Sequence, residues 1–186
     1  MERRELLRMI AVLTGTAFIG GEVFLSGCTS ADASAFSWSQ KDLDFLNEVG
    51  ETILPATSTP GAKAANVSMV MKAIVTDCYD EKSQTAFIDG IKKLNEASDK
   101  KFNNSFLKIT QPQREELLKE IDAEAKEYQK NKKQEDAAHY FTMMKQLTLL
   151  GYFTSEVGCK QALRYLAIPQ RYEGCVPYNK GEKAIV

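Results

Sequence analysis

The chain has 186 residues, of which 44% are hydrophobic and 26% charged, and its 24 Lys and Arg against 25 Asp and Glu give a net charge of −1. This length allows one domain with a tail, and the apolar content excludes wholesale disorder. The charge balance excludes a nucleic-acid binder that works through a general basic field. No uniformly apolar stretch reaches the 18 residues of a spanning helix. One histidine and four cysteines leave little material for a metal site or a histidine-based catalytic centre, so the composition favours a binding or structural role.

The first 28 residues have the form of an export signal. A basic start is followed by a mostly apolar segment and then by small residues before Cys28, which is the pattern of a secreted protein. Residues 25–28 (LSGC) resemble the bacterial lipobox, in which the cysteine is acylated and becomes the new N-terminus. We therefore expect an exported lipoprotein on the periplasmic side, anchored to a membrane through Cys28, with the small and polar residues 29–37 as a tether.

The basic start also resembles the twin-arginine export motif. Arg3 and Arg4 are followed by two leucines and then by Arg8. That route carries proteins that are already folded, often with a cofactor inside. The alternative is an ordinary secretory signal that happens to contain the arginine pair.

Helical periodicity dominates the chain from residue 38 onward, and no alternating strand pattern competes with it. The clearest helix start has Thr110 as its cap and Pro112 in its first turn, whereas Pro60 and Gly61 mark a turn-rich loop. Helices are expected over residues 39–55, 67–79, 81–98, 110–130, 139–153 and 154–166. The sequence therefore predicts a single all-α domain of five to seven helices over residues 38–186, ending in an irregular C-terminal arm at residues 167–186.

Apolar spacing within these helices predicts the core. Residues 139–153 are apolar nearly all round, so this segment is expected to be the central helix, ended or bent at Gly151. The helix over residues 110–130 is expected to bury Leu117, Ile121 and Tyr128.

Few residues suggest chemistry. No Gly-x-Gly-x-x-Gly follows a strand and no Cys-x-x-Cys-His occurs, which argues against a dinucleotide or flavin site and against covalent c-type haem. His139 lies on an apolar helix face and is interpreted as a packed or rim histidine rather than a ligand or base. Glu48 and Glu51 fit a solvated helix edge better than an acid–base pair. We expect no catalytic, cofactor-binding or metal-binding residue on this chain.

Three cysteines remain beside Cys28, namely Cys78, Cys159 and Cys175. An exported location permits disulfides, and the odd number leaves at least one thiol free or paired with another chain. A bridge from Cys159 to Cys175 would join the last helix to the arm. Iron–sulfur ligation is disfavoured because no two of these cysteines are close in sequence.

Several motifs resemble the gluconate 2-dehydrogenase subunit 3 family. They are, in chain order, ILPAT at 53–57, TPGAKAA at 59–65, GYFTSEVG at 151–158, ALRY at 162–165 and RYEGCVP at 171–177. The resemblance implies a small, non-catalytic subunit of a membrane-associated sugar or sugar-acid dehydrogenase. Its partner would be a large flavoprotein of the glucose–methanol–choline type that binds FAD, sometimes with a cytochrome c subunit as electron acceptor. The small subunit of this family carries the export signal for both chains and assists assembly of the large one.

The arm and the residues just before it carry side chains suited to binding this partner. Tyr and Arg each bury a large area while keeping a polar end that can be satisfied, and Cys175 offers a thiol for a cross-link. The candidate interface residues are Tyr165, Arg171, Tyr172, Cys175 and Tyr178. The other interpretation is that these residues fold back and cap the chain's own helices.

Two other classes of function compete with the accessory subunit. A lipoprotein acting alone would bind a sugar or peptide through the same tyrosines and Arg171. An independent enzyme would need a cleft with a perturbed acid or base, which the sequence does not reveal.

Overall fold

The computed structural model describes residues 36–168, 174–175, 177 and 179–185, and the chain divides into two units, Met1–Ser37 and Trp38–Val186. Arg3, Arg4 and Cys28 of the predicted export signal lie outside the described residues. In the second unit, the described part contains five α-helices and one short π-helix, and its only β-type pairing is an isolated bridge between Arg164 and Ile185. The predicted all-α class is confirmed.

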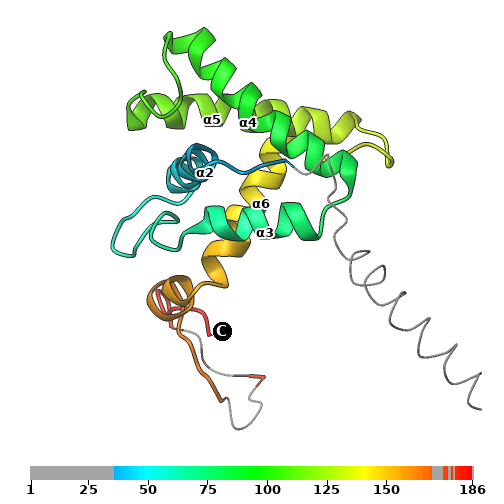
Figure 1. Cartoon of the computed structure of the whole chain (residues 1–186). Coiled ribbons are helices and arrows are strands. Elements are labelled where there is room, and N and C mark those ends of the chain that lie inside the picture. The colour runs from blue at the N-terminus through cyan, green and yellow to red at the C-terminus, as the bar shows by residue number, and fades with distance from the viewer. Residues whose placement is uncertain (1–35, 169–173, 176, 178, 186) are drawn as a thin grey trace, which may run out of the picture. The chain divides into compact units, whose positions relative to one another are not determined.

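The helices follow one another along the chain, and the longest connection within this helical series joins α2 to α3 (Figure 1). They are α2 (Gln40–Ile53), α3 (Val67–Asp77), α4 (Glu81–Phe102), α5 (Gln111–Asn131), α6 (Tyr140–Phe153) and the π-helix η1 (Gly158–Ala162).

Two helix starts have the capping residues that the sequence predicts. Ser39 caps α2 in a reciprocal capping box with Asp42, in which the Ser39 amide donates to the Asp42 carboxylate at 2.9 Å. Thr110 caps α5 in the same way with Gln113. Each box satisfies backbone amides that a helix start would otherwise leave without an acceptor.

Helix α4 runs four residues beyond its predicted end at residue 98. Ser98 is completely buried and its hydroxyl donates to the Asn104 carbonyl oxygen at 2.8 Å, so the last turn packs within the fold. The helix ends only at Asn103, which adopts the left-handed conformation with φ of 53°. Asn is one of the few residues besides Gly that adopts this conformation readily.

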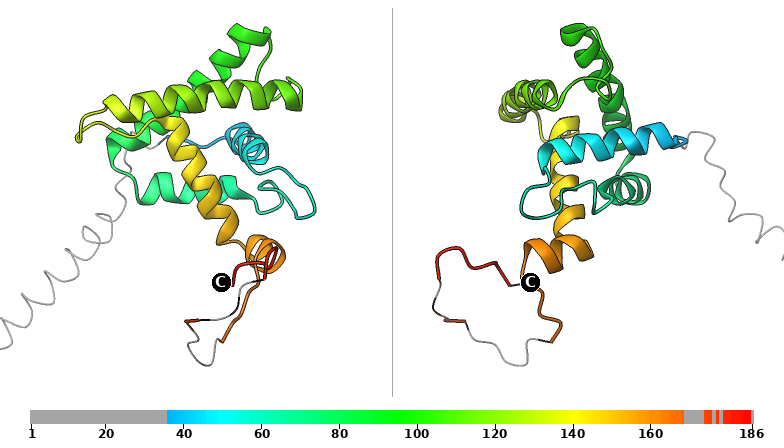
Figure 2. Two further views of the ribbon diagram at one scale, coloured as in Figure 1. Left: turned by 180° about the vertical axis from the view of Figure 1, so that it is seen from behind. Right: turned by 90° about the vertical axis from the view of Figure 1, so that its left-hand side faces the viewer.

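Helix α6 is the centre of the fold, as the sequence predicts. It crosses between the other elements and contacts α2, α3, α4, α5 and η1, and the views in Figure 2 show it running diagonally through the helices. The side chains of Phe141, Met144 and Leu147 are at most 4% exposed. Burying each such side chain contributes roughly 1.5–3 kcal/mol to folding, so α6 holds the domain together.

Gly151 lies inside α6, so of the two predicted alternatives, that it ends or bends the helix, the first is wrong. A Cβ at this position would lie 3.3 Å from Cβ of Val70, so the missing side chain lets α3 approach α6 closely. The turn after α6 depends on a different glycine. A Cβ at Gly158 would lie 2.0 Å from the Tyr152 carbonyl oxygen, which only glycine avoids.

Two further predictions are corrected. Leu117 and Ile121 are buried as expected, but Tyr128 is exposed, because its hydroxyl reaches the Ala137 carbonyl oxygen at 3.1 Å in the connection to α6. The predicted helix over residues 154–166 contains the π-helix η1 and stops at Ala162, after which Leu163 is extended.

Candidate functional site

Two of the segments that carry the family resemblance meet in space. The Tyr152 hydroxyl at the end of α6 donates to the Pro60 carbonyl oxygen of the 55–65 loop at 2.6 Å. Ala62 of this loop is fully buried, and a Cβ at Gly50 would lie 3.5 Å from it, so the loop packs directly on α2. Residues about 90 positions apart in the chain thus form one structural unit.

Glu51 organises the 55–65 loop from within α2. Its carboxylate accepts hydrogen bonds from the backbone amides of Ala56 at 2.9 Å and Lys63 at 2.8 Å. A Cβ at Gly61 would lie 2.3 Å from this carboxylate, so glycine is needed for the loop to wrap around it. Glu51 thus lies at a partly exposed helix edge, as the sequence predicts, and in addition holds the loop in place.

Glu48 links three parts of the fold. Its carboxylate pairs with the Lys63 ammonium and lies 2.6 Å from the Arg114 guanidinium. Arg114 also donates to the carbonyl oxygens of Phe106 at 3.1 Å and Leu107 at 2.9 Å. Burial opposes ionisation of Glu48, but the hydrogen bonds from Lys63 and Arg114 outweigh it and lower the pKa of the carboxyl. Glu48 is thus a structural anion, which corrects the prediction of a solvated edge.

The C-terminal end of α6 exposes three large apolar side chains, which we call the α6 end surface. Leu149, Leu150 and Phe153 are 39%, 48% and 38% exposed. Positions three and four apart lie side by side on a helix, so the three form one apolar strip. Exposed apolar surface of this kind is typical of a site that another protein covers.

Exposed apolar residues continue in the segment after η1. Tyr165, Leu166 and Ile168 are 53%, 49% and 76% exposed. Among the candidate interface residues, Tyr165 and Cys175 are exposed, whereas Arg171, Tyr172 and Tyr178 lie outside the described residues. The solvent-facing position of Tyr165 does not agree with a role in capping the chain's own helices.

The end of the arm returns to the segment at which it starts. The Arg164 amide donates to the Ala184 carbonyl oxygen at 2.8 Å, and the Arg164 guanidinium lies 3.7 Å from the Glu182 carboxylate. The Lys183 ammonium donates to the Gln161 carbonyl oxygen. The described residues 182–184 of the arm are therefore held beside η1.

The cysteines of the described part are free thiols, Cys78 and Cys175 exposed and Cys159 half-buried. The Cys159 thiol donates to the Phe153 carbonyl oxygen at 3.2 Å. The bridge between Cys159 and Cys175 is not formed.

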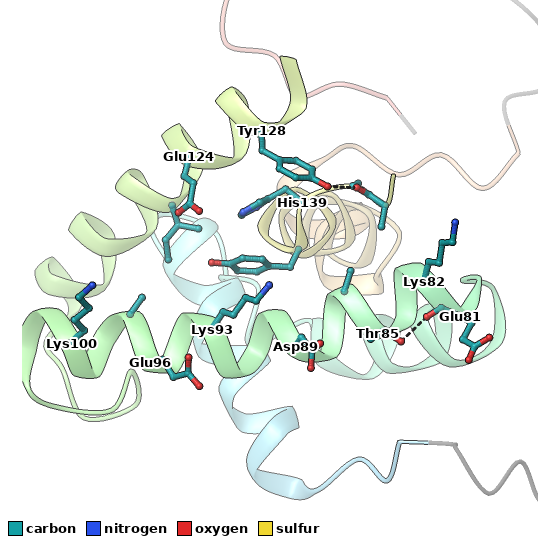
Figure 3. Close-up of a pocket in the computed structure, with 16 residues that line it drawn as sticks. Glu81, Lys82, Thr85, Asp89, Lys93, Glu96, Lys100, Glu124, Tyr128 and His139 are labelled. Carbon is teal, nitrogen blue, oxygen red and sulfur yellow. Dashed lines mark hydrogen bonds between the residues drawn. The ribbon is translucent and has the colours of Figure 1, made fainter. Parts of the chain in front are cut away.

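A groove of about 910 Å³ lies between α4, α5 and the connection that leads into α6 (Figure 3). His139 lines the groove as the N-cap of α6, 8% exposed, where its Nδ1 accepts a hydrogen bond from the Phe141 amide at 3.3 Å. Burial lowers the pKa of His139, which keeps the ring neutral near pH 7. This confirms the interpretation of His139 as a packed or rim histidine.

In the described part of the chain, no group of three or more His, Cys, Asp and Glu side chains is arranged to hold a metal ion. No helix in the same residues has the length and hydropathy needed to cross a membrane.

A family model described as gluconate 2-dehydrogenase subunit 3 matches residues 40–169. The chain belongs to the gluconate 2-dehydrogenase subunit 3 family. Comparisons with curated proteins and with solved structures gave no match. The matched region of this subunit 3 protein contains every described helix, the 55–65 loop and the α6 end surface. Its family name makes the chain a subunit of a dehydrogenase complex and agrees with an accessory role.

Sequence reasoning did not identify the α6 end surface or the roles of Glu48 and Glu51. The apolar run at 139–153 contains Leu149, Leu150 and Phe153, but a helix that is apolar all round is expected to be buried all round. One signal in the sequence could have revealed the surface. The helix over residues 139–153 has apolar residues on all sides, and the other predicted helices are too few to cover every one of these sides.

Proposed function

We propose that this subunit 3 protein is the non-catalytic small subunit of an exported FAD-dependent sugar or sugar-acid dehydrogenase. It binds a large flavoprotein of the glucose–methanol–choline type and assists its assembly. FAD and the oxidation chemistry belong to the large subunit, and a cytochrome c subunit is a further candidate member of the complex. The single observation that carries this proposal is the family match over residues 40–169.

The surface of the helical domain supports a binding role. The α6 end surface and the exposed residues Tyr165, Leu166 and Ile168 lie before and after η1 along the chain. A partner that covers them would remove apolar area from water, which contributes about 25 cal/mol per Å² before the costs of association. We place the contact with the large subunit here, together with Cys175 and the rest of the arm.

The export signal fits the same role. A flavoprotein must acquire FAD before it crosses a membrane, and a twin-arginine signal at Arg3 and Arg4 permits export of a folded complex. Acylation at Cys28 would then anchor the complex at the periplasmic side. One acyl chain gives only marginal membrane binding, whereas two or more hold a protein stably.

The test is co-expression of the large flavoprotein with and without this chain, lacking residues 1–28 so that both stay in the same compartment. With the chain present, the flavoprotein should be soluble, carry FAD and elute together with it. If the flavoprotein folds and binds FAD equally well alone and does not co-elute, the accessory role is wrong. A chain that instead binds a free sugar or peptide would support the lipoprotein acting alone.

A further inference from the structure

His139 is the single histidine of the chain, and it lies where α4, α5 and α6 meet (Figure 3). Its ring centroid is 5.5 Å from that of Tyr128 on α5 and 4.3 Å from that of Tyr140 on α6. Tyr140 also packs on Gly90 of α4, so closely that a Cβ at Gly90 would overlap its side chain. A change at the His139 ring therefore reaches all three helices.

The hydrogen bond that starts α6 depends on the protonation state of His139. This residue is the N-cap, and its Nδ1 accepts from the Phe141 amide at 3.3 Å. An imidazole nitrogen accepts only while it carries no proton, and in the imidazolium ion both nitrogens are donors. The usual N-cap residues, Ser, Thr, Asp and Asn, offer an oxygen instead. A histidine cap is thus one that a single proton removes.

The charges around the ring oppose a proton more than they favour it. Burial is the largest effect and lowers the pKa of His139 below its ordinary value of 6.5; Glu124 of α5 acts in the other direction and Lys93 of α4 in the same one. The positive pole of α6 also repels a cation at its N-cap. Figure 3 shows Glu124 beside the ring, whereas the carboxylates of Asp89 and Glu96 on α4 point away from it.

Two tyrosines hold the His139 ring between them, as Figure 3 shows. The Tyr128 hydroxyl donates to the Ala137 carbonyl oxygen at 3.1 Å, which ties α5 to the connection that carries His139. Burial raises the pKa of Tyr140 to about 12, so its hydroxyl adds no charge where a histidine titrates. Both ring faces would attract an imidazolium, but this attraction does not replace the lost cap bond.

From this geometry we infer that His139 is an acid-sensitive switch at the start of α6. The neutral ring caps the helix. A proton from solvent, taken up at Nδ1 through the groove that the ring lines, releases the Phe141 amide and draws the ring toward the Glu124 carboxylate. The first turn of α6 then loosens together with its contact to α4. The switch acts within this chain and does not depend on the proposed function.

The switch has a defined pH range. Because folding lowers the pKa of His139, the stability that depends on the neutral ring is fully present above 6.5 and is lost as pH falls from there through the lowered value. The folding equilibrium constant should fall by up to about tenfold per pH unit in this range, since unfolding takes up one proton. Glu48 acts below its ordinary pKa of 4.5, so the two effects are separable.

Two measurements between about pH 5.5 and 7.5, where histidine is the side chain that normally titrates, test the switch. In NMR spectra of the wild-type chain, the single imidazole should titrate below 6.5, and hydrogen-exchange protection of the Phe141 amide should fall as it does. In thermal unfolding, the wild type should lose stability on acidification, whereas His139→Asn should not, because Asn caps a helix without titrating.

Neighbouring charges provide matched variants. Glu124→Gln should lower the pKa of His139 further and Lys93→Gln should raise it, whereas Glu96→Gln, whose carboxylate points away from the ring, should leave it unchanged. A wild-type pKa of 6.5 or higher overturns the switch, as does a Phe141 amide that stays equally protected in both protonation states. Equal pH dependence in His139→Asn and the wild type also overturns it. If His139→Asn fails to fold, the NMR titration of the wild type still decides.

Discussion

Individual charged residues stabilise this domain more than the sequence suggests, and Glu48 is the clearest case. Its lowered pKa means that folding favours the ionised carboxylate. The stability that it contributes is therefore fully present above the ordinary pKa of 4.5 and is lost as pH falls through the lowered value in the folded state. Glu48→Gln should reduce the free energy of unfolding by about 1–3 kcal/mol at pH 7. The loss should shrink on acidification, as measured by urea unfolding at several pH values.

Glu116→Gln is the control for Glu48→Gln. Glu116 also pairs with a cation, Lys101, but its side chain is 58% exposed, and exposed pairs contribute little. An equal and pH-independent loss in both variants would contradict the anchoring role of Glu48.

Replacing Gly90 of α4 by alanine should have an effect opposite to the usual one. Gly→Ala in a helix interior normally stabilises by about 0.5–1 kcal/mol. Here the new Cβ would lie 2.3 Å from Cβ of Tyr140, so α6 would have to shift. Gly90→Ala should instead destabilise by roughly 1–3 kcal/mol, measured as a lower melting temperature. A stabilised variant would show that the contact between α4 and Tyr140 is looser than described.

At the scale of single elements, the N-terminal caps of α2 and α5 could be predicted from the sequence. The contacts between one helix and another could not. Ser39 and Thr110 cap their helices through bonds to residues three positions away, so the sequence alone contains both partners. Glu48 and Arg114 are 66 positions apart, and no local pattern links them. The same reason explains Tyr128, whose position depends on the connection to α6 rather than on the period of α5.

The α6 end surface gives a prediction at the level of one helix. Leu150→Lys combined with Phe153→Lys should leave the helical circular dichroism spectrum and the melting temperature nearly unchanged, because both side chains already face solvent. Binding of the large subunit should fall by about tenfold or more, since lysines at a buried interface leave unpaired charge. Leu107→Lys, at an exposed leucine in the connection before α5, should bind normally. Normal binding by the double variant would place the interface elsewhere.

At the scale of the whole molecule, the all-α class and the position of α6 follow from apolar periodicity, which is local. The candidate site was predictable only in part. In the sequence, the apolar residues of the α6 end surface look like core residues, and they differ from the core only because no other helix packs over them. That depends on the packing of all the helices together. Of the residues expected in the interface, Tyr165 and Cys175 are described and exposed.

Export is a property of the whole chain and its partner. Replacing Arg3 and Arg4 by lysines keeps the charge but removes the guanidinium groups that twin-arginine recognition would require. Both this chain and a large subunit without its own signal should then remain inside the cell, as cell fractionation would show. Cys28→Ala, the companion variant, should affect membrane attachment rather than the choice of export route. Unchanged export of both proteins by the lysine variant would indicate the ordinary secretory route.

The central claim is that the chain works as a subunit of a flavoprotein dehydrogenase. Its most direct test is affinity purification of the tagged chain from membranes of the native host, followed by mass spectrometry and by extraction of bound flavin. The account predicts one large protein in equimolar amount with the chain, and FAD in the same amount as that protein. Recovery of the chain alone and without flavin, from cells that contain the large subunit, would contradict it.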